Sequence, residues 1–211
     1  MKKKKILLLS PHTDDAELGA GGTIAKLLKN NKIYYAAFSI CENSIPKKWP
    51  KNILEKEVHL ATKLLGIKAK NLFIFKHEVR SFPEIRQTIL NEIISLRKKI
   101  KPDLVIIPSG NDYHQDHQVL NKEAIRAFKT CASIICYELP WNHVDFKTDF
   151  FVQLTKEHIN KKMQALKEYK SQISLKRPYF TKEFIFGLAK VRGTQCNSDY
   201  AESFEVIRWR I

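Results

Sequence analysis

The chain has 211 residues, of which 44% are hydrophobic and 10% aromatic, so it is long enough and apolar enough to form a packed domain. This composition excludes an intrinsically disordered protein, and no stretch approaches the roughly 18 apolar residues of a membrane span. The net charge of +15 raises the question of a nucleic-acid partner. However, the lysines are scattered over the polar faces of predicted helices. Their distribution favours a solvated basic surface, with a basic rim that attracts an anionic substrate as the alternative.

The N-terminus and the cysteines indicate the cellular compartment in which the protein is expected. A run of lysines precedes the apolar segment 6–9, which is far shorter than the apolar region of a secretory signal. The four cysteines, Cys41, Cys131, Cys136 and Cys196, show no Cys-x-x-Cys spacing, so we expect them to be free and mostly buried rather than zinc ligands. We therefore expect a cytoplasmic protein.

Apolar strands and helical patterns alternate along the chain. Strands are expected at 5–10, 32–40, 71–75, 102–108 and 132–139, and helices at 17–30, 52–65, 83–100 and 117–129. Further on, the pattern predicts a strand at 150–154, helices at 156–171 and 181–190, and a strand at 203–210. Because the first strands are uniformly apolar, they predict a mostly parallel sheet covered on both faces. The expected fold is α/β, a three-layer α/β/α sandwich with a Rossmann-like sheet in a single domain, 1–211.

Two loops rich in His and Asp follow the first and the fourth predicted strands. In a doubly wound sheet these loops meet where the strand order reverses, which is the usual ligand site. The loop "SPHTDD" contains His12, Asp14 and Asp15, and the loop "PSGNDYHQDH" contains His114, Asp116 and His117. Adjacent carboxylates repel each other unless a cation lies between them. Imidazole and carboxylate are ordinary zinc ligands, and three of them with one open position are typical of a catalytic zinc site.

The segment "GAGG" that follows the first loop resembles part of a dinucleotide-binding motif. NAD binding is excluded because Asp14 and Asp15 occupy the turn in which a pyrophosphate would lie. The glycines are interpreted instead as positions of close packing between helix and sheet. The other histidines, His59, His77, His143 and His158, are expected on the surface or in the core, with a place in the pocket as the alternative for His143.

The motifs "SPHTDDAELGAGGTIA" and "NDYHQDH" resemble the two zinc motifs of the PIG-L/LmbE-like family of zinc-dependent N-acetylglucosamine deacetylases. The resemblance continues in "KKMQALKEYKSQ" (161–172) and "VRGTQCNSDYAESFEVIR" (191–208), and so covers nearly the whole chain. It implies an LmbE-like fold and one zinc ion per chain.

The resemblance also implies a role for each residue of the two loops. His12, Asp15 and His117 would bind zinc, and Asp14 would be the general base. His114 would face the reacting carbonyl in its protonated form, with Asp116 as the acid between the two histidines. The implied reaction is hydrolysis of the N-acetyl group of a small-molecule amino-sugar conjugate.

Three departures from the family pattern stand out. Thr13 replaces a proline, which should loosen the turn but keep the ligands. The segment 54–57 lacks the arginine that reaches the substrate, and Lys51 or Arg80 is a candidate replacement. The segment "FVQLT" replaces one that often contains an aspartate.

Two other functions remain open from the sequence. One is a metal-dependent amidohydrolase with a non-sugar amide substrate, and the other is a basic nucleic-acid-binding protein. We expect no specific nucleic-acid partner and no membrane span. The sugar, its carrier and the oligomeric state, a homo-oligomer included, are left open.

Overall fold

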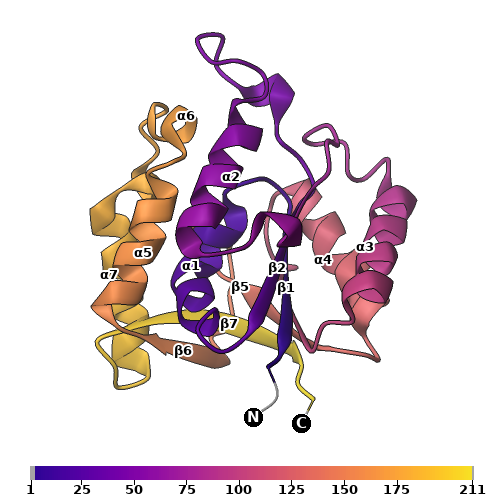
Figure 1. Cartoon of the computed structure of the whole chain (residues 1–211). Coiled ribbons are helices and arrows are strands. Elements are labelled where there is room, and N and C mark those ends of the chain that lie inside the picture. The colour runs from indigo at the N-terminus through magenta and orange to yellow at the C-terminus, as the bar shows by residue number, and fades with distance from the viewer. Residues whose placement is uncertain (1–2, 211) are drawn as a thin grey trace.

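Residues 3–210 are described by a computed structural model, in which seven strands form one sheet with the order β3-β2-β1-β4-β5-β7-β6 (Figure 1). Strands β1 to β5 are mutually parallel, whereas β7 runs antiparallel to both of its neighbours, β5 and β6. The bounds are β1 Lys5–Ser10, β2 Lys32–Ala37, β3 Leu72–Ile74, β4 Leu104–Pro108, β5 Ser133–Tyr137, β6 Phe150–Leu154 and β7 Tyr200–Arg208. The expected mostly parallel sheet is confirmed.

Helices cover both faces of the sheet, which completes the expected three-layer arrangement (Figure 1). One face carries α1 Asp15–Leu27, α2 Ile53–Leu65, α5 Lys156–Leu166, the short α6 Lys170–Ile173 and α7 Lys182–Gln195. The other face carries α3 Arg86–Ile100 and α4 Gln115–Phe128. Within residues 3–210, no helix is both long enough and apolar enough to cross a bilayer.

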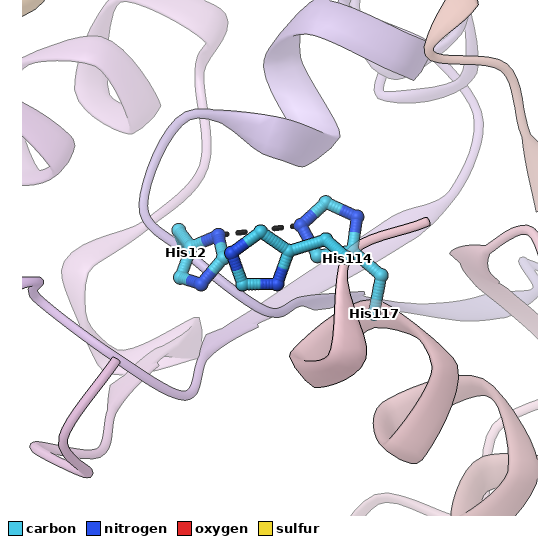
Figure 2. A group of neighbouring side chains, drawn as sticks. All are labelled: His12, His114 and His117. Carbon is cyan, nitrogen blue, oxygen red and sulfur yellow. Dashed lines mark hydrogen bonds between the residues drawn. The ribbon is translucent and has the colours of Figure 1, made fainter. Parts of the chain in front are cut away.

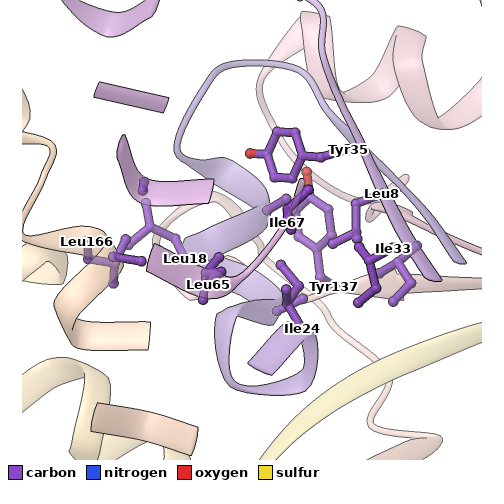
Figure 3. Close-up of a cluster of buried hydrophobic side chains, with 14 of the residues drawn as sticks. Leu8, Leu18, Ile24, Ile33, Tyr35, Leu65, Ile67, Tyr137 and Leu166 are labelled. Atoms are coloured by element: carbon purple, nitrogen blue, oxygen red, sulfur yellow. The ribbon is translucent and has the colours of Figure 1, made fainter. Parts of the chain in front are cut away.

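Each face of the sheet has its own hydrophobic core, because successive side chains of a strand point to opposite sides. Leu8 belongs to the core under α1, whereas its neighbours Leu7 and Leu9 belong to the core under α3 and α4. Figure 3 shows part of the first core, which includes Leu8 of β1 and Ile24 of α1. Side chains of both cores are almost completely buried, so the sheet is a rigid base for the loops at its edge.

Helix α1 lies unusually close to the sheet at its glycines. A Cβ atom on Gly19 would lie 2.4 Å from Cδ2 of Tyr137 on β5, and one on Gly22 would lie 2.6 Å from Cδ1 of Leu154 on β6. The helix also has a non-helical residue at Ala20, where it kinks. The interpretation of "GAGG" as a close-packing segment is confirmed.

Several helix boundaries differ from those expected: α1 covers Asp15–Leu27 rather than 17–30, and α7 continues to Gln195 rather than ending at 190. Two further differences have a clear cause in the structure. Helix α3 begins at Arg86 rather than at Pro83, because the preceding loop donates backbone N–H groups of Arg80 and Phe82 to the carboxylate of Asp116. The helix expected at 156–171 ends at Leu166, because Tyr169 turns its side chain into the core and its hydroxyl toward the loop after β1.

The cysteines are free, as expected, but the expectation that most are buried is wrong. Only Cys136, on the interior strand β5, is buried. Cys41 and Cys196 are half-buried at helix ends, and Cys131 is exposed in the turn before β5. The sequence pattern failed here because three of the cysteines lie at chain turns rather than in core elements.

Candidate active site

The two loops rich in His and Asp meet at the carboxyl ends of β1 and β4, which are adjacent in the sheet. His12 lies on the loop after β1, while His114 caps the N-terminus of α4 and His117 lies in its first turn. Figure 2 shows the three imidazole rings together, and their metal-ligating nitrogens lie within 4.8 Å of one another. The sequence therefore placed these residues at the correct junction of the fold.

Three donor atoms form a nearly equilateral triangle at this junction. His12 Nδ1 lies 3.1 Å from Asp15 Oδ2, His117 Nε2 lies 3.2 Å from Asp15 Oδ2, and the two nitrogens are 3.2 Å apart. Ligands of a tetrahedral zinc ion, each about 2.0–2.2 Å from the metal, are about 3.3–3.6 Å apart. The spacing of the three atoms thus fits one divalent cation.

Each of the two histidines in the triangle turns its other ring nitrogen toward a buried carboxylate. His117 Nδ1 lies 2.7 Å from Asp112 Oδ2, and His12 Nε2 lies 3.1 Å from Asp116 Oδ2. Metal-bound histidines typically donate their second N–H to such a carboxylate, which fixes the tautomer and the ring orientation. These contacts direct a lone pair of each ring toward the centre of the triangle, so the donor set fits a metal ion.

Asp112 is a residue of this site that the sequence did not single out. Its side chain is completely buried, and besides His117 it accepts a hydrogen bond of 2.8 Å from the backbone N–H of His114. One carboxylate therefore holds both the N-cap and the first turn of α4. The only sequence signal was its place two residues before His114 in the same polar loop.

Asp116 lies behind the triangle rather than in the open cleft. Its carboxylate is completely buried and accepts hydrogen bonds from the backbone N–H groups of Arg80, at 2.6 Å, and Phe82, at 3.3 Å. Burial opposes its ionisation, but the hydrogen bonds from His12 and Arg80 hold the pKa of Asp116 below its usual value. The geometry favours orientation of His12 over proton transfer to a substrate.

The adjacent aspartates have opposite surroundings. Burial opposes the ionisation of Asp15, but contacts with His117 and His12 hold the pKa of Asp15 well below its usual value. Burial, reinforced by the charge of Asp15, raises the pKa of Asp14 to about 6. Asp14 is the N-cap residue of α1, its side chain makes no cap hydrogen bond, and it lines the cleft. Asp14 is therefore the carboxylate that is free to exchange a proton.

His114 offers a neutral hydrogen-bond donor to the cleft. Burial, together with the neighbouring His12 and His117, lowers the pKa of His114 to about 4. Its Nδ1 accepts a hydrogen bond of 3.2 Å from the backbone N–H of Asp116, so the proton of the neutral ring is on Nε2. These surroundings favour a neutral ring with one N–H donor over the imidazolium expected at this position.

The turn between His12 and Asp14 is held through the carbonyl of Thr13. The hydroxyl of Tyr35, on β2, donates to this oxygen at 2.9 Å, and the hydroxyl of Tyr169 reaches it at 2.5 Å. Both phenols also contact the buried carboxyl of Glu17. Although threonine replaces the proline of the family pattern, two side chains from distant elements therefore fix the turn.

The cleft above the triangle has a volume of about 240 Å³. Asp14, His114 and Arg80 line it, whereas Lys51, the other candidate for the substrate-anchoring position, does not. The side chain of His143 is 3% exposed and lies behind Asp112, so the suggested place for this histidine in the pocket is wrong.

Comparison with known proteins identifies the family. The sequence profile of PIG-L, described as GlcNAc-PI de-N-acetylase, matches residues 7–128, which include both loops of the site. The chain belongs to the PIG-L family. Membership places it among the deacetylases, as the resemblance of its motifs implied. A curated relative, the uncharacterized deacetylase YaiS of Escherichia coli, is 29% identical over 178 residues, covering 81% of this chain and 92% of YaiS.

Solved structures show the same fold. The N,N'-diacetylchitobiose deacetylase of Pyrococcus horikoshii superposes with a TM-score of 0.77 at 21% identity, covering 97% of this chain and 84% of that one. GalB of Pseudomonas putida, a 4-carboxy-2-hydroxymuconate hydratase, also has a TM-score of 0.77, at 19% identity, covering 99% of this chain and 98% of GalB. Since one fold carries both activities, the reaction of this PIG-L protein has to be argued from its site.

Proposed function

We propose that this PIG-L protein is a zinc-dependent hydrolase that removes the N-acetyl group from an N-acetylated amino sugar or its conjugate. The observation that carries the proposal is the triangle formed by His12, Asp15 and His117, with the free carboxylate of Asp14 beside it. The match to the PIG-L profile, described as GlcNAc-PI de-N-acetylase, supports an amino-sugar substrate.

His12, Asp15 and His117 would hold one zinc ion per chain in this proposal. When bound, zinc lowers the pKa of a water molecule to about 7 and polarises a carbonyl group. Asp112 and Asp116 would position His117 and His12 through the ring nitrogens that face away from the triangle.

Asp14 and His114 would carry out the proton chemistry. Asp14 accepts a proton from the water molecule whose oxygen attacks the acetyl carbon. Nε2–H of His114 donates a hydrogen bond to the acetyl oxygen as negative charge develops there. The C–N bond then breaks, and the proton held by Asp14 passes to the departing amine nitrogen, which yields acetate and the free amino sugar.

Acetate release tests the proposal directly. The purified protein, loaded with one equivalent of zinc, is incubated with N-acetylglucosamine, its glycosides and, as a matched non-sugar amide, an N-acetylated amino acid. Cobalt and manganese are tested in parallel, because teicoplanin deacetylase Orf2, a structural neighbour, occurs in a zinc-inhibited form. We expect release from the sugar substrates. Release from the amino acid alone would favour the amidohydrolase alternative.

Nucleic-acid binding is the alternative from a different functional class. Its test is a DNA mobility-shift assay at physiological salt, in which a functional basic surface gives tight and steeply salt-dependent binding. We expect only weak, non-specific binding. A submicromolar dissociation constant at that salt concentration would contradict our interpretation of the +15 charge.

A further inference from the structure

Arg177 occupies a wall of the cleft that no sequence motif indicated. It lies between α6 and α7, and it lines the cleft together with Tyr179 and Trp141. Trp141 reaches the same wall from the segment after β5. Two segments that are distant in the sequence therefore combine to place one guanidinium beside the candidate active site.

The guanidinium of Arg177 is held in place by an aromatic side chain. Its Nη1 donates a hydrogen bond to the hydroxyl of Tyr179, and its Cζ lies 5.8 Å from the centre of the Tyr179 ring. Tyr179 in turn stacks on Trp141, with ring centres 3.9 Å apart and an angle of 8° between the ring planes. These contacts restrict the exposed guanidinium of Arg177 before a ligand arrives, which lowers the entropic cost of binding.

Arg177 has no carboxylate partner among the described residues, in contrast to several other arginines. Arg86, Arg126 and Arg192 each form an ion pair with a buried glutamate. For Arg177, no carboxylate oxygen of residues 3–210 lies within 4.0 Å, although the charges of Asp14 and Asp15 act on it across the cleft. A planar guanidinium with free N–H donors is suited to bidentate binding of carboxylate or phosphate.

We propose that Arg177, held by Tyr179, binds an anionic substituent of the amino-sugar substrate, a carboxylate or a phosphate, and so favours charged over neutral glycosides. This inference rests on the proposed function. The cleft, at about 240 Å³, is smaller than the roughly 300–1,000 Å³ of most ligand pockets, so it suits one sugar ring. The stacked pair Trp141–Tyr179 supplies an apolar wall for that ring, and Arg177 supplies the charge for its substituent.

Binding of non-hydrolysable ligands tests this assignment without turnover. The zinc-loaded protein is titrated by calorimetry with glucose 1-phosphate, carboxymethyl glucoside and methyl glucoside, none of which has an acetyl group to lose. We expect at least one anionic glucoside to bind roughly 10- to 100-fold more tightly than methyl glucoside, as a charged hydrogen-bonded pair predicts. The arm with the larger preference identifies carboxylate or phosphate as the source of the charge.

Substitutions at residues 176 and 177 then test whether the preference for anionic glucosides depends on Arg177. In Arg177→Gln the ratio of anionic to neutral affinity should fall to near one. Lys176→Gln removes the same charge from the neighbouring exposed residue, which does not line the cleft, and should keep the wild-type ratio. Arg177→Lys keeps the charge without the planar fork and should give an intermediate ratio, which is also the decisive variant if Arg177→Gln does not fold.

The results separate this inference from the proposed function. Equal affinity of the wild type for all three glucosides, or a ratio unchanged in Arg177→Gln, would overturn the role of Arg177. If the corresponding N-acetylglucosaminides still release acetate, the proposed deacetylase activity is retained although the role of Arg177 is not. Conversely, the anion preference can depend on Arg177 while no substrate releases acetate. That result would overturn the proposed deacetylase activity and retain the anion site.

Discussion

In the proposed mechanism, two adjacent aspartates perform different tasks because their surroundings differ. Asp15 faces two histidines and is stabilised as a carboxylate, whereas Asp14 is buried beside that charge and makes no cap hydrogen bond. A cation in the triangle would relieve the repulsion between the two carboxyl groups. At the scale of single residues, these surroundings support the proposed roles of Asp15 as a metal ligand and Asp14 as the proton acceptor.

The variants Asp14→Asn and Asp15→Asn should consequently fail in different ways. Asp15→Asn removes a charged ligand and should lose most of its zinc. Asp14→Asn leaves the triangle complete, so it should retain about one zinc ion per chain while turnover falls by roughly 10²–10⁴-fold. Zinc is measured by elemental analysis and acetate by a coupled assay on the same preparations. Retention of metal by Asp15→Asn together with its loss from Asp14→Asn would reverse the assignment.

Asp112 should control the affinity for metal although it is not a ligand. Asp112→Asn weakens the acceptor for Nδ1 of His117, so the ring is held less firmly in the required tautomer. We expect the zinc dissociation constant to rise by about 10- to 100-fold, measured by competition with a chelating dye. Asp199→Asn is the control, because that side chain is 85% exposed. Equal zinc affinity of the two variants would show that Asp112 has no influence on the metal.

At the scale of elements, the approach of α1 to the sheet depends on glycine. The ring of Tyr137 is completely buried and has no room to move away from a new Cβ atom on Gly19. Gly19→Ala should therefore lower the free energy of unfolding by about 1–3 kcal/mol, measured by denaturant titration. Gly187→Ala is the matched control, because its Cβ meets nothing within 4 Å on α7, and it should raise stability by about 0.5–1 kcal/mol.

Features set by neighbouring residues could be predicted from the sequence, whereas features set by distant contacts could not. Strands such as β1 were predictable because a continuous apolar run is a local signal of a buried parallel strand. The start of α3 was not, because Arg80 and Phe82, just before Pro83, donate backbone N–H groups to Asp116, a partner more than thirty positions away. Asp112 and Arg177 could not be predicted for the same reason, because their roles depend on which side chains the fold places opposite them. The motif residues were found because two short patterns carry them.

At the scale of the whole molecule, the metal and the fold are separable. The hydrophobic clusters on the two faces of the sheet contain none of the metal-ligating residues. His117 lies at hydrogen-bonding distance from both Asp15 and Asp112, so its ring keeps carboxylate partners when no metal is bound. These two features distinguish the protein from small zinc domains, in which the metal supplies the folding energy.

Removal of the metal should therefore abolish catalysis while leaving the fold in place. After dialysis against a chelator we expect no acetate release and an unchanged far-ultraviolet circular dichroism spectrum. A metal that binds only the native state stabilises it by about 2.7 kcal/mol at a hundred times its dissociation constant. For a chain of this length, the midpoint of thermal unfolding should fall by roughly 5–10 °C when zinc is removed. Return of one equivalent of zinc should restore both the midpoint and the activity. If chelation instead eliminates the helical signal in the circular dichroism spectrum, the ion is structural. Loss of activity on chelation would then no longer indicate a catalytic metal.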